Sequence, residues 1–122
     1  MAQLPAKRNL AQIERRFGDW GPGYLVDEGD AFFGSVLLRP GDEFTNHSHA
    51  RHTESFLVLR GRAELWLDRS QLVELAQGDF IGCPPGVEHF FRNTADEPFE
   101  AFFVKAPGVS GDKVDAPWTP TS

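Results

Sequence analysis

The stretch Gly41–Gly61, GDEFTNHSHARHTESFLVLRG, decides the fold prediction because it places closely spaced histidines ahead of an apolar run. His47 and His49 are two residues apart, so on an extended strand both side chains point to the same face. A turn over residues 50–53 would bring the chain back, so that Glu54 faces the two histidines. This stretch therefore predicts that imidazole and carboxylate groups meet on one side of a β-sheet.

A second stretch, Gly78–Asn93, reads GDFIGCPPGVEHFFRN and contains the remaining histidine. His89 follows the turn-forming residues 84–86 and opens another apolar run. Imidazole nitrogens combined with a carboxylate suit Mn, Fe, Co, Ni, Cu or Zn better than Mg or Ca. If His89 joins the first group, the two stretches together predict a transition-metal site.

The spacing of the two stretches carries a family resemblance. The first reads G-x5-H-x-H-x4-E-x6-G and the second G-x5-P-x-G-x2-H-x3-N, with residues 62–77 between them. The pair resembles the two motifs of the cupin superfamily with every position filled. The resemblance implies a small single-domain cupin, an all-β double-stranded β-helix or jelly-roll barrel. It also implies that one divalent transition metal (Fe, Mn, Ni, Co or Zn) is held by His47, His49, Glu54 and His89.

The rest of the chain agrees with an all-β domain. Its 122 residues include 11 Phe, 12 Gly and nine Pro, and apolar runs of strand length end at turn-forming residues. We expect one domain, 1–122, with an N-terminal arm over 1–30, a barrel core over 31–105 and an extended tail over 106–122. A short amphipathic helix is expected at 9–17. The expected strands are 31–39, 55–60, 63–67, 72–75, 80–83, 89–92 and 99–105.

The net charge and the cysteine content limit the possible partners and cross-links of the chain. The net charge of −6 disfavours nucleic-acid and anionic-membrane partners, and the single cysteine excludes an internal disulfide. Because no signal peptide or membrane-spanning run is recognised, we expect a cytoplasmic protein. Cys83 is interpreted as a buried apolar residue, with a redox role as the alternative. Trp66 is expected on the outer face, where it can contact a second copy in a homodimer.

Strand parity predicts the surroundings of the metal. Phe56 and Val58 share parity with Glu54, and Phe91 shares parity with His89, so we expect these three to line an apolar substrate pocket.

If Glu54 is not a ligand it can transfer protons. The other candidates for catalytic acid–base work are His52 and Tyr24. His52 lies outside the motif and is interpreted as a loop residue at the barrel mouth, with a proton shuttle or substitute ligand as the alternative. The cations considered for binding a substrate carboxylate are Arg39, Arg60, Arg62, Arg92 and Lys105.

The predicted function is a metal-dependent enzyme that acts on a small oxygenated organic molecule. Two reaction types remain open: oxygen chemistry on an enediol, diketone or catechol, and Lewis-acid isomerisation, cyclisation, decarboxylation or dehydration. The alternative is a non-catalytic module that binds a small molecule or metal in the same pocket. A structural or storage role is a third hypothesis, for which a metal site would be unnecessary.

Overall fold

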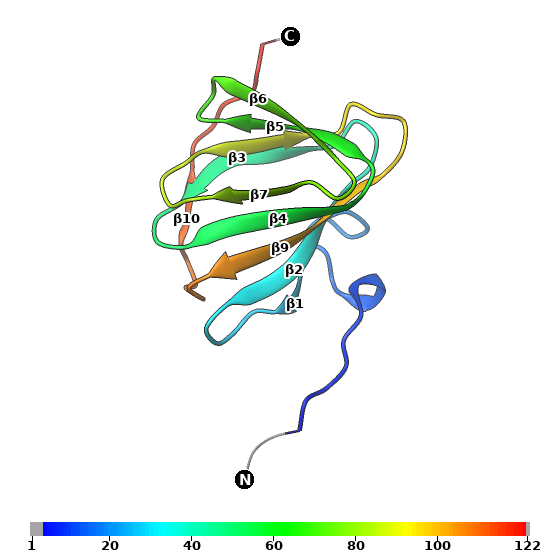
Figure 1. Ribbon diagram of the computed structural model, residues 1–122, viewed down its shortest axis with the longest axis vertical. Coiled ribbons are helices and arrows are strands. Elements are labelled where there is room, and N and C mark those ends of the chain that lie inside the picture. The colour runs from blue at the N-terminus through cyan, green and yellow to red at the C-terminus, as the bar shows by residue number, and fades with distance from the viewer. Residues whose placement is uncertain (1–3, 122) are drawn as a thin grey trace.

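Strands form nearly all of the regular structure (Figure 1). The computed structural model describes residues 4–121. The strands are β1 (Gly21–Val26), β2 (Phe32–Leu38), β3 (Glu43–His49), β4 (Thr53–Arg60), β5 (Arg62–Leu67), β6 (Gln71–Ala76), β7 (Phe80–Cys83), β8 (His89–Arg92), β9 (Phe99–Ala106) and β10 (Lys113–Asp115).

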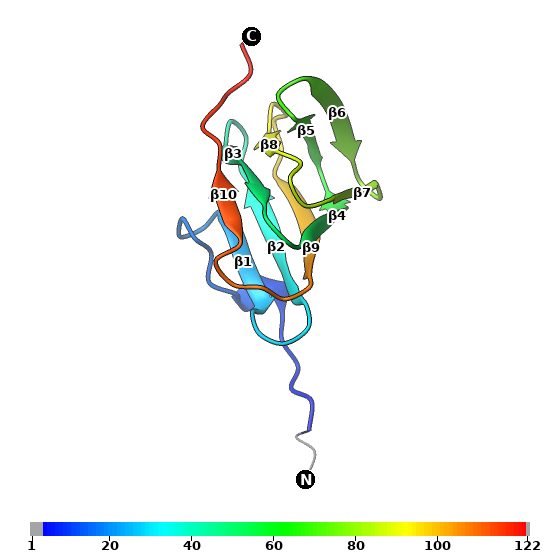
Figure 2. The ribbon, with the colours of Figure 1, turned by 90° about the vertical axis from the view of Figure 1, so that its left-hand side faces the viewer.

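The strands divide into two five-stranded sheets, both antiparallel throughout. One sheet has the order β1-β2-β9-β4-β7 and the other β10-β3-β8-β5-β6. Figure 2, turned by 90°, shows β10 beside β3, two strands that are far apart in the sequence. Consecutive strands such as β3 and β4 belong to different sheets, as a jelly roll requires. The predicted all-β jelly-roll barrel is confirmed, and the seven expected strands agree with β2 and β4–β9 to within two residues at each end.

The core lies between the two sheets and follows the alternation of the strands. Along β9, Phe99, Ala101 and Phe103 are buried, while the residues between them are only partly buried. From the facing sheet, Leu65 and Phe91 pack into the same cluster. Phenylalanine supplies most of this core because aromatic side chains fill the wide space between two sheets.

Several connections between strands turn at a glycine with positive φ. Gly61 joins β4 to β5 with φ +79°, a conformation that side chains rarely adopt. A Cβ at this position would also lie 2.2 Å from the carbonyl oxygen of Pro98. Gly61 is therefore required both by its backbone conformation and by the close approach of a neighbouring chain segment.

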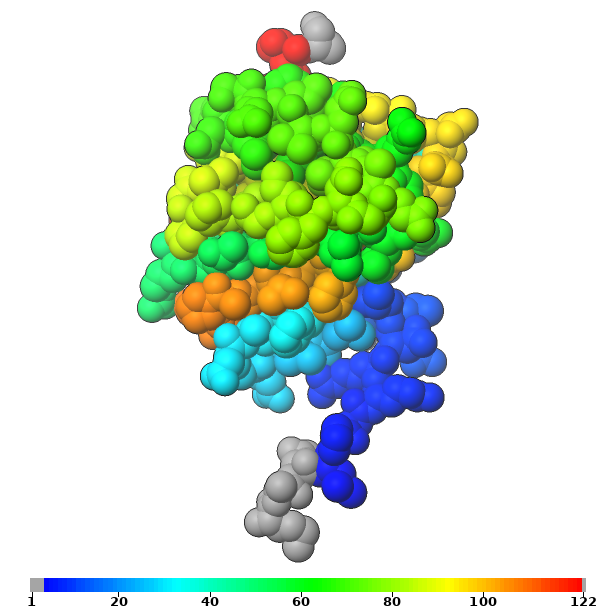
Figure 3. All heavy atoms as spheres, in the orientation of Figure 1, coloured from blue at the N-terminus to red at the C-terminus, as the bar shows by residue number. Residues whose placement is uncertain are grey.

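The N-terminal arm predicted over 1–30 is wrong in its extent, because β1 lies within it and joins the sheet beside β2. The predicted helix at 9–17 reduces to a 3-10 turn, Leu10–Gln12. The reason is Arg15, whose guanidinium bonds to Ser35 and Glu100 on the sheet while its backbone bridges to Gly23. A segment tied to the sheet in this way cannot continue as a helix. Figure 3 shows it, in blue, along the lower edge of the barrel.

The C-terminal tail predicted over 106–122 also contains barrel structure. β10 pairs with β3, the strand that carries His47 and His49, with Lys113 opposite His49 and Asp115 opposite His47. Beyond β10, Trp118 packs edge-on against Trp66, with ring centroids 6.0 Å apart. The outer face of Trp66 is thus partly covered by this chain's own C-terminal segment.

Within residues 4–121, no helix is long and apolar enough to span a membrane.

Candidate metal centre

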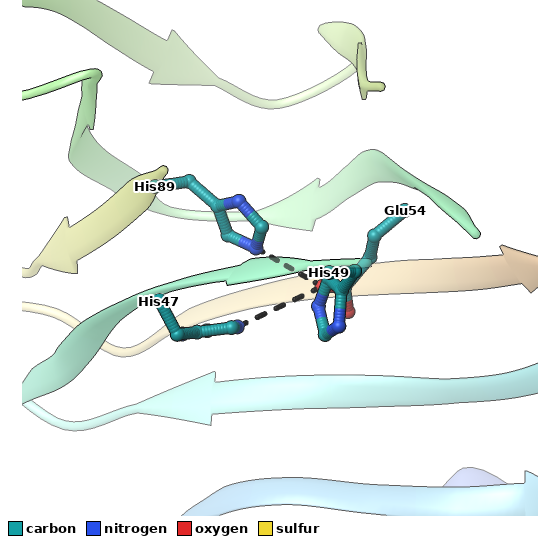
Figure 4. Close-up of side chains that lie close together, drawn as sticks. All are labelled: His47, His49, Glu54 and His89. Atoms are coloured by element: carbon teal, nitrogen blue, oxygen red, sulfur yellow. Dashed lines mark hydrogen bonds and ion pairs between the residues drawn. The ribbon is translucent and has the colours of Figure 1, made fainter. Parts of the chain in front are cut away.

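Four buried side chains from three strands meet between the sheets. His47 and His49 lie on β3, and His89 opens the neighbouring β8, directly opposite His47 in the register. Glu54 comes from β4 in the other sheet. The ligand atoms of these four side chains lie within 4.8 Å of one another, and all four residues are buried. The predicted convergence of both histidines, the glutamate and His89 is therefore present (Figure 4).

One carboxylate oxygen lies at the centre of the group. Glu54 Oε1 is 2.8 Å from His49 Nε2 and 3.1 Å from His89 Nε2. The Nε2 atom of His47 lies 4.0 Å from the same oxygen. The three rings are thus turned so that each presents its Nε2 to the same small volume.

Backbone carbonyls fix the tautomer of two of these rings. His47 Nδ1 donates to the carbonyl oxygen of Thr45 at 2.7 Å, and His89 Nδ1 donates to that of Val87 at 3.1 Å. A neutral imidazole that donates through Nδ1 has only a lone pair at Nε2. Lone pairs then converge on the carboxylate, an arrangement that a bound cation would stabilise and that matches the usual outer contacts of metal-bound histidines.

Burial, aided by nearby His89, lowers the pKa of His47 to about 3, so this ring is neutral near pH 7. Burial by itself would raise the pKa of Glu54. The hydrogen bond from His49, together with the charge of Lys105, instead holds that pKa well below its usual value. A neutral imidazole beside an ionised carboxylate is the protonation state that metal binding requires. The donor set therefore fits a divalent transition metal.

His52 lies in the loop between β3 and β4, where it lines the cavity and is buried. It is 2% exposed, and its ring centroid lies 4.1 Å from that of His49, with the two rings tilted by 40°. Its Nδ1 is 3.2 Å from Asp112 Oδ2, and burial, followed by the influence of His49, lowers its pKa to about 4. His52 is a loop residue, as interpreted from the sequence, but the C-terminal segment packs over the loop and buries its side chain. No sequence pattern indicated Asp112, which lies in the predicted tail.

A cavity of about 560 Å³ opens above the centre. Phe56 and Phe91 line it, as expected from strand parity. Val58, expected beside them, does not line the cavity. It lies two residues beyond Phe56 on β4 and packs in the core. Tyr24 lines the cavity from β1 and accepts a hydrogen bond from Lys105.

Of the five cations considered for binding a substrate carboxylate, Lys105 alone lines the cavity. Arg39 pairs with Asp42, Arg92 with Glu43 and Arg60 with Glu100. Which of the five cations faces the cavity depends on how the strands pack across the barrel, and the sequence does not show this.

Cys83 lies next to the site without taking part in it. The residue is 2% exposed, and burial raises the pKa of its thiol to about 12. A thiol with that pKa is protonated and unreactive at neutral pH. The interpretation as a small buried apolar residue fits this position.

Comparison with known proteins agrees with the fold and the site. The family model of the cupin domain matches residues 34–105, which include both motifs. This chain is a cupin.

Curated relatives of this cupin match over part of their length. Quercetin 2,3-dioxygenase of Bacillus subtilis is 38% identical over 69 residues, which are 57% of this chain and 18% of that protein. Polyketide synthase CurC of Streptomyces cyaneus is 32% identical over 76 residues, or 62% and 49% of the two chains. The cupin spans less than half the length of each of these relatives.

Solved structures share the fold over more of the chain. A double-stranded β-helix protein from Klebsiella pneumoniae superposes with a TM-score of 0.81 and 24% identity, over 94% of this cupin and all of that chain. DMSP lyase DddQ from Ruegeria pomeroyi superposes with a TM-score of 0.72 and 20% identity, over 90% and 59% of the two chains. At these identities the similarity shows the shared barrel.

Proposed function

We propose that this cupin is a metal-dependent enzyme that acts on a small oxygenated organic molecule. The observation that carries the proposal is the convergence of three Nε2 atoms and one carboxylate at the base of an apolar cavity. Four protein ligands leave positions free on a six-coordinate metal, and Fe, Mn, Ni, Co and Zn all accept this donor set. A bound metal would act as a Lewis acid or support reaction with oxygen.

The chain's own residues supply the rest of the site. Phe56 and Phe91 exclude water from one side of the cavity, and apolar walls suit an organic skeleton. Glu54 is surrounded by histidines, so proton transfer is assigned to Tyr24 or His52, which both line the cavity. His52, with its lowered pKa, is neutral near pH 7 and would act as a base.

Oxygen chemistry is the reaction type we test first, because one relative is named a quercetin dioxygenase. The metal-loaded cupin is given quercetin, a catechol and a 1,2-diketone, and oxygen consumption is recorded. We expect turnover with at least one of them and its loss in the His89→Ala variant, whose fold is checked by circular dichroism. Turnover without oxygen uptake in a parallel product assay would favour Lewis-acid chemistry.

The second candidate is a binding module that uses the same cavity without catalysis. A cavity with buried donors and apolar walls serves a sensor as well as an enzyme. Tight binding of an organic ligand, combined with the absence of turnover across a broad substrate panel, would favour it over the enzyme.

A further inference from the structure

Lys105 occupies an unusual position at the end of β9. Its Nζ donates a hydrogen bond to the Tyr24 hydroxyl at 2.6 Å, and its side chain is only 14% exposed. The ammonium lies 5.1 Å from the centroid of the Tyr24 ring and 5.2 Å from that of Phe103. The Tyr24 hydroxyl and the Phe103 ring thus hold a charged group at the wall of the cavity.

The charge of Lys105 is incompletely matched by protein carboxylates. Glu54 Oε2 lies 3.9 Å from Nζ, which is beyond hydrogen-bond distance, while Oε1 of the same carboxylate faces the histidines. Two other cations on the cavity wall have closer carboxylate partners, whereas Arg16, on the same wall, lies over the rings of Phe17 and Phe44. Arg15 bonds to Glu100 at 3.1 Å, and Lys113 lies 3.4 Å from Asp115. A metal bound to Glu54 would neutralise part of the negative charge of that carboxylate. The positive charge of Lys105 would then be offset even less.

We propose that Lys105 and Tyr24 form a subsite for the carboxylate of a small organic acid, next to the metal centre. An ammonium has three N–H donors, and the hydrogen bond to Tyr24 uses one of them. A carboxylate can accept from the others, and the Tyr24 hydroxyl, already an acceptor, can donate its own hydrogen to the same group. Binding of the acid at this subsite does not depend on the proposed enzyme function. Only the statement that the acid is the substrate rests on that function.

The walls of the cavity indicate what the acid carries besides its carboxylate. Phe32, Phe56, Phe91 and Phe103 line the cavity, and Phe103 lies against the ammonium. Aromatic walls favour a flat apolar skeleton, and one charge-assisted contact in such surroundings dominates discrimination between similar ligands. The geometry therefore selects small aromatic or unsaturated acids over their neutral counterparts.

The test compares an acid with its neutral isostere on the same protein. Phenylacetate and phenylacetamide are titrated into the metal-loaded cupin by calorimetry. We expect phenylacetate to bind about tenfold more tightly, which corresponds to about 1.4 kcal/mol. Lys105→Met keeps the apolar stem but removes the charge. This variant should bind phenylacetate and phenylacetamide about equally. Tyr24→Phe should reduce it by a smaller factor, and Lys105→Arg should retain part of it.

Lys113→Met is the matched control, because it removes the same charge from a lysine that lines the same cavity. The control should keep the full preference for phenylacetate, and the melting temperature of each variant shows that it is folded. A preference that survives in Lys105→Met, an equal loss in Lys113→Met, or no preference in the wild-type protein would overturn the proposal.

A second arm separates this subsite from the metal function. The titrations are repeated on protein stripped of metal with a chelator, with metal content measured on each sample. A preference that depends on Lys105 in both states supports the subsite, even if the metal enzyme hypothesis fails. A preference that disappears with the metal and ignores Lys105 would mean that the metal itself binds the carboxylate.

Discussion

Asp112 and His52 are sixty residues apart in the sequence, yet Asp112 Oδ2 accepts a hydrogen bond from the backbone N–H of His52 at 2.9 Å. The same oxygen accepts from the N–H of Arg51 at 2.9 Å. The backbone carbonyl of Asp112 also accepts from Ala50 at 3.0 Å. One residue of the C-terminal segment therefore fixes the loop that joins His49 to Glu54.

Replacing Asp112 by alanine leaves two backbone N–H groups without their acceptor. We expect the free energy of unfolding to fall by about 1–3 kcal/mol. Because the loop positions two residues of the candidate metal site, the affinity for metal should fall as well, by about 10-fold or more. Chemical denaturation and a competitive chelator titration measure the two effects. Asp115→Ala, on the exposed end of β10, is the control and should leave both unchanged. Equal effects of the two substitutions would contradict this account.

Much of the barrel could be predicted from sequence because its interior strands are apolar runs that end at glycine or proline. β1 could not, since it begins Gly-Pro-Gly, which is typical of a turn. It is an edge strand, where a proline is tolerated because one side of the backbone needs no partner. β10 could not either, since a three-residue strand with two charged side chains has no apolar pattern of its own. Its pairing depends on β3 being in place.

The candidate site divides in the same way. The spacing of His47 and His49 on one strand determines that their side chains share a face, and the short loop after them orients Glu54. The positions of Asp112 and Lys105 depend instead on contacts between segments far apart in the chain. No local pattern distinguishes these two residues from ordinary surface charges, so sequence reasoning missed the first and left the second among several cations.

A comparison of Gly61 with Gly41 separates two costs of replacing a turn glycine: the steric clash of the added Cβ and the strain of a positive φ. Both have a positive φ, but a Cβ on Gly61 would lie 2.2 Å from a backbone carbonyl oxygen, whereas one on Gly41 meets no atom within 4 Å. We expect Gly41→Ala to lower the free energy of unfolding by about 1–2 kcal/mol. Gly61→Ala should lower it by about 3 kcal/mol or more. Urea denaturation measures both, and equal losses would contradict the predicted clash.

The metal-free protein should lose stability as the solution becomes acidic. The pKa of His47 is about 3 in the folded state and near 6.5 when unfolded, so between these values the unfolded chain binds a proton that the folded chain does not. His47 alone should therefore lower the free energy of unfolding by about 2 kcal/mol between pH 7 and pH 5. The His47→Gln variant should show a correspondingly weaker dependence on pH. An identical pH profile for the two proteins would refute the assignment.

Cys83 should resist thiol reagents while the protein is folded. Its burial and its pKa of about 12 leave almost no thiolate at pH 8. We expect the rate of reaction with an aromatic disulfide reagent to rise by a factor of about 100 or more on unfolding in urea, because an exposed thiol has a pKa near 8.5. Fast reaction of the native protein would show that the segment carrying Cys83 opens readily.

The central claim is that His47, His49, Glu54 and His89 form a metal site. Its most direct test is elemental mass spectrometry of protein purified without a histidine tag or chelator and then incubated with Fe, Mn, Ni, Co or Zn. We predict about one metal ion per chain, and far less for the His47→Ala and His89→Ala variants that remain folded. A wild-type chain that stays free of metal under every one of these conditions would contradict the claim.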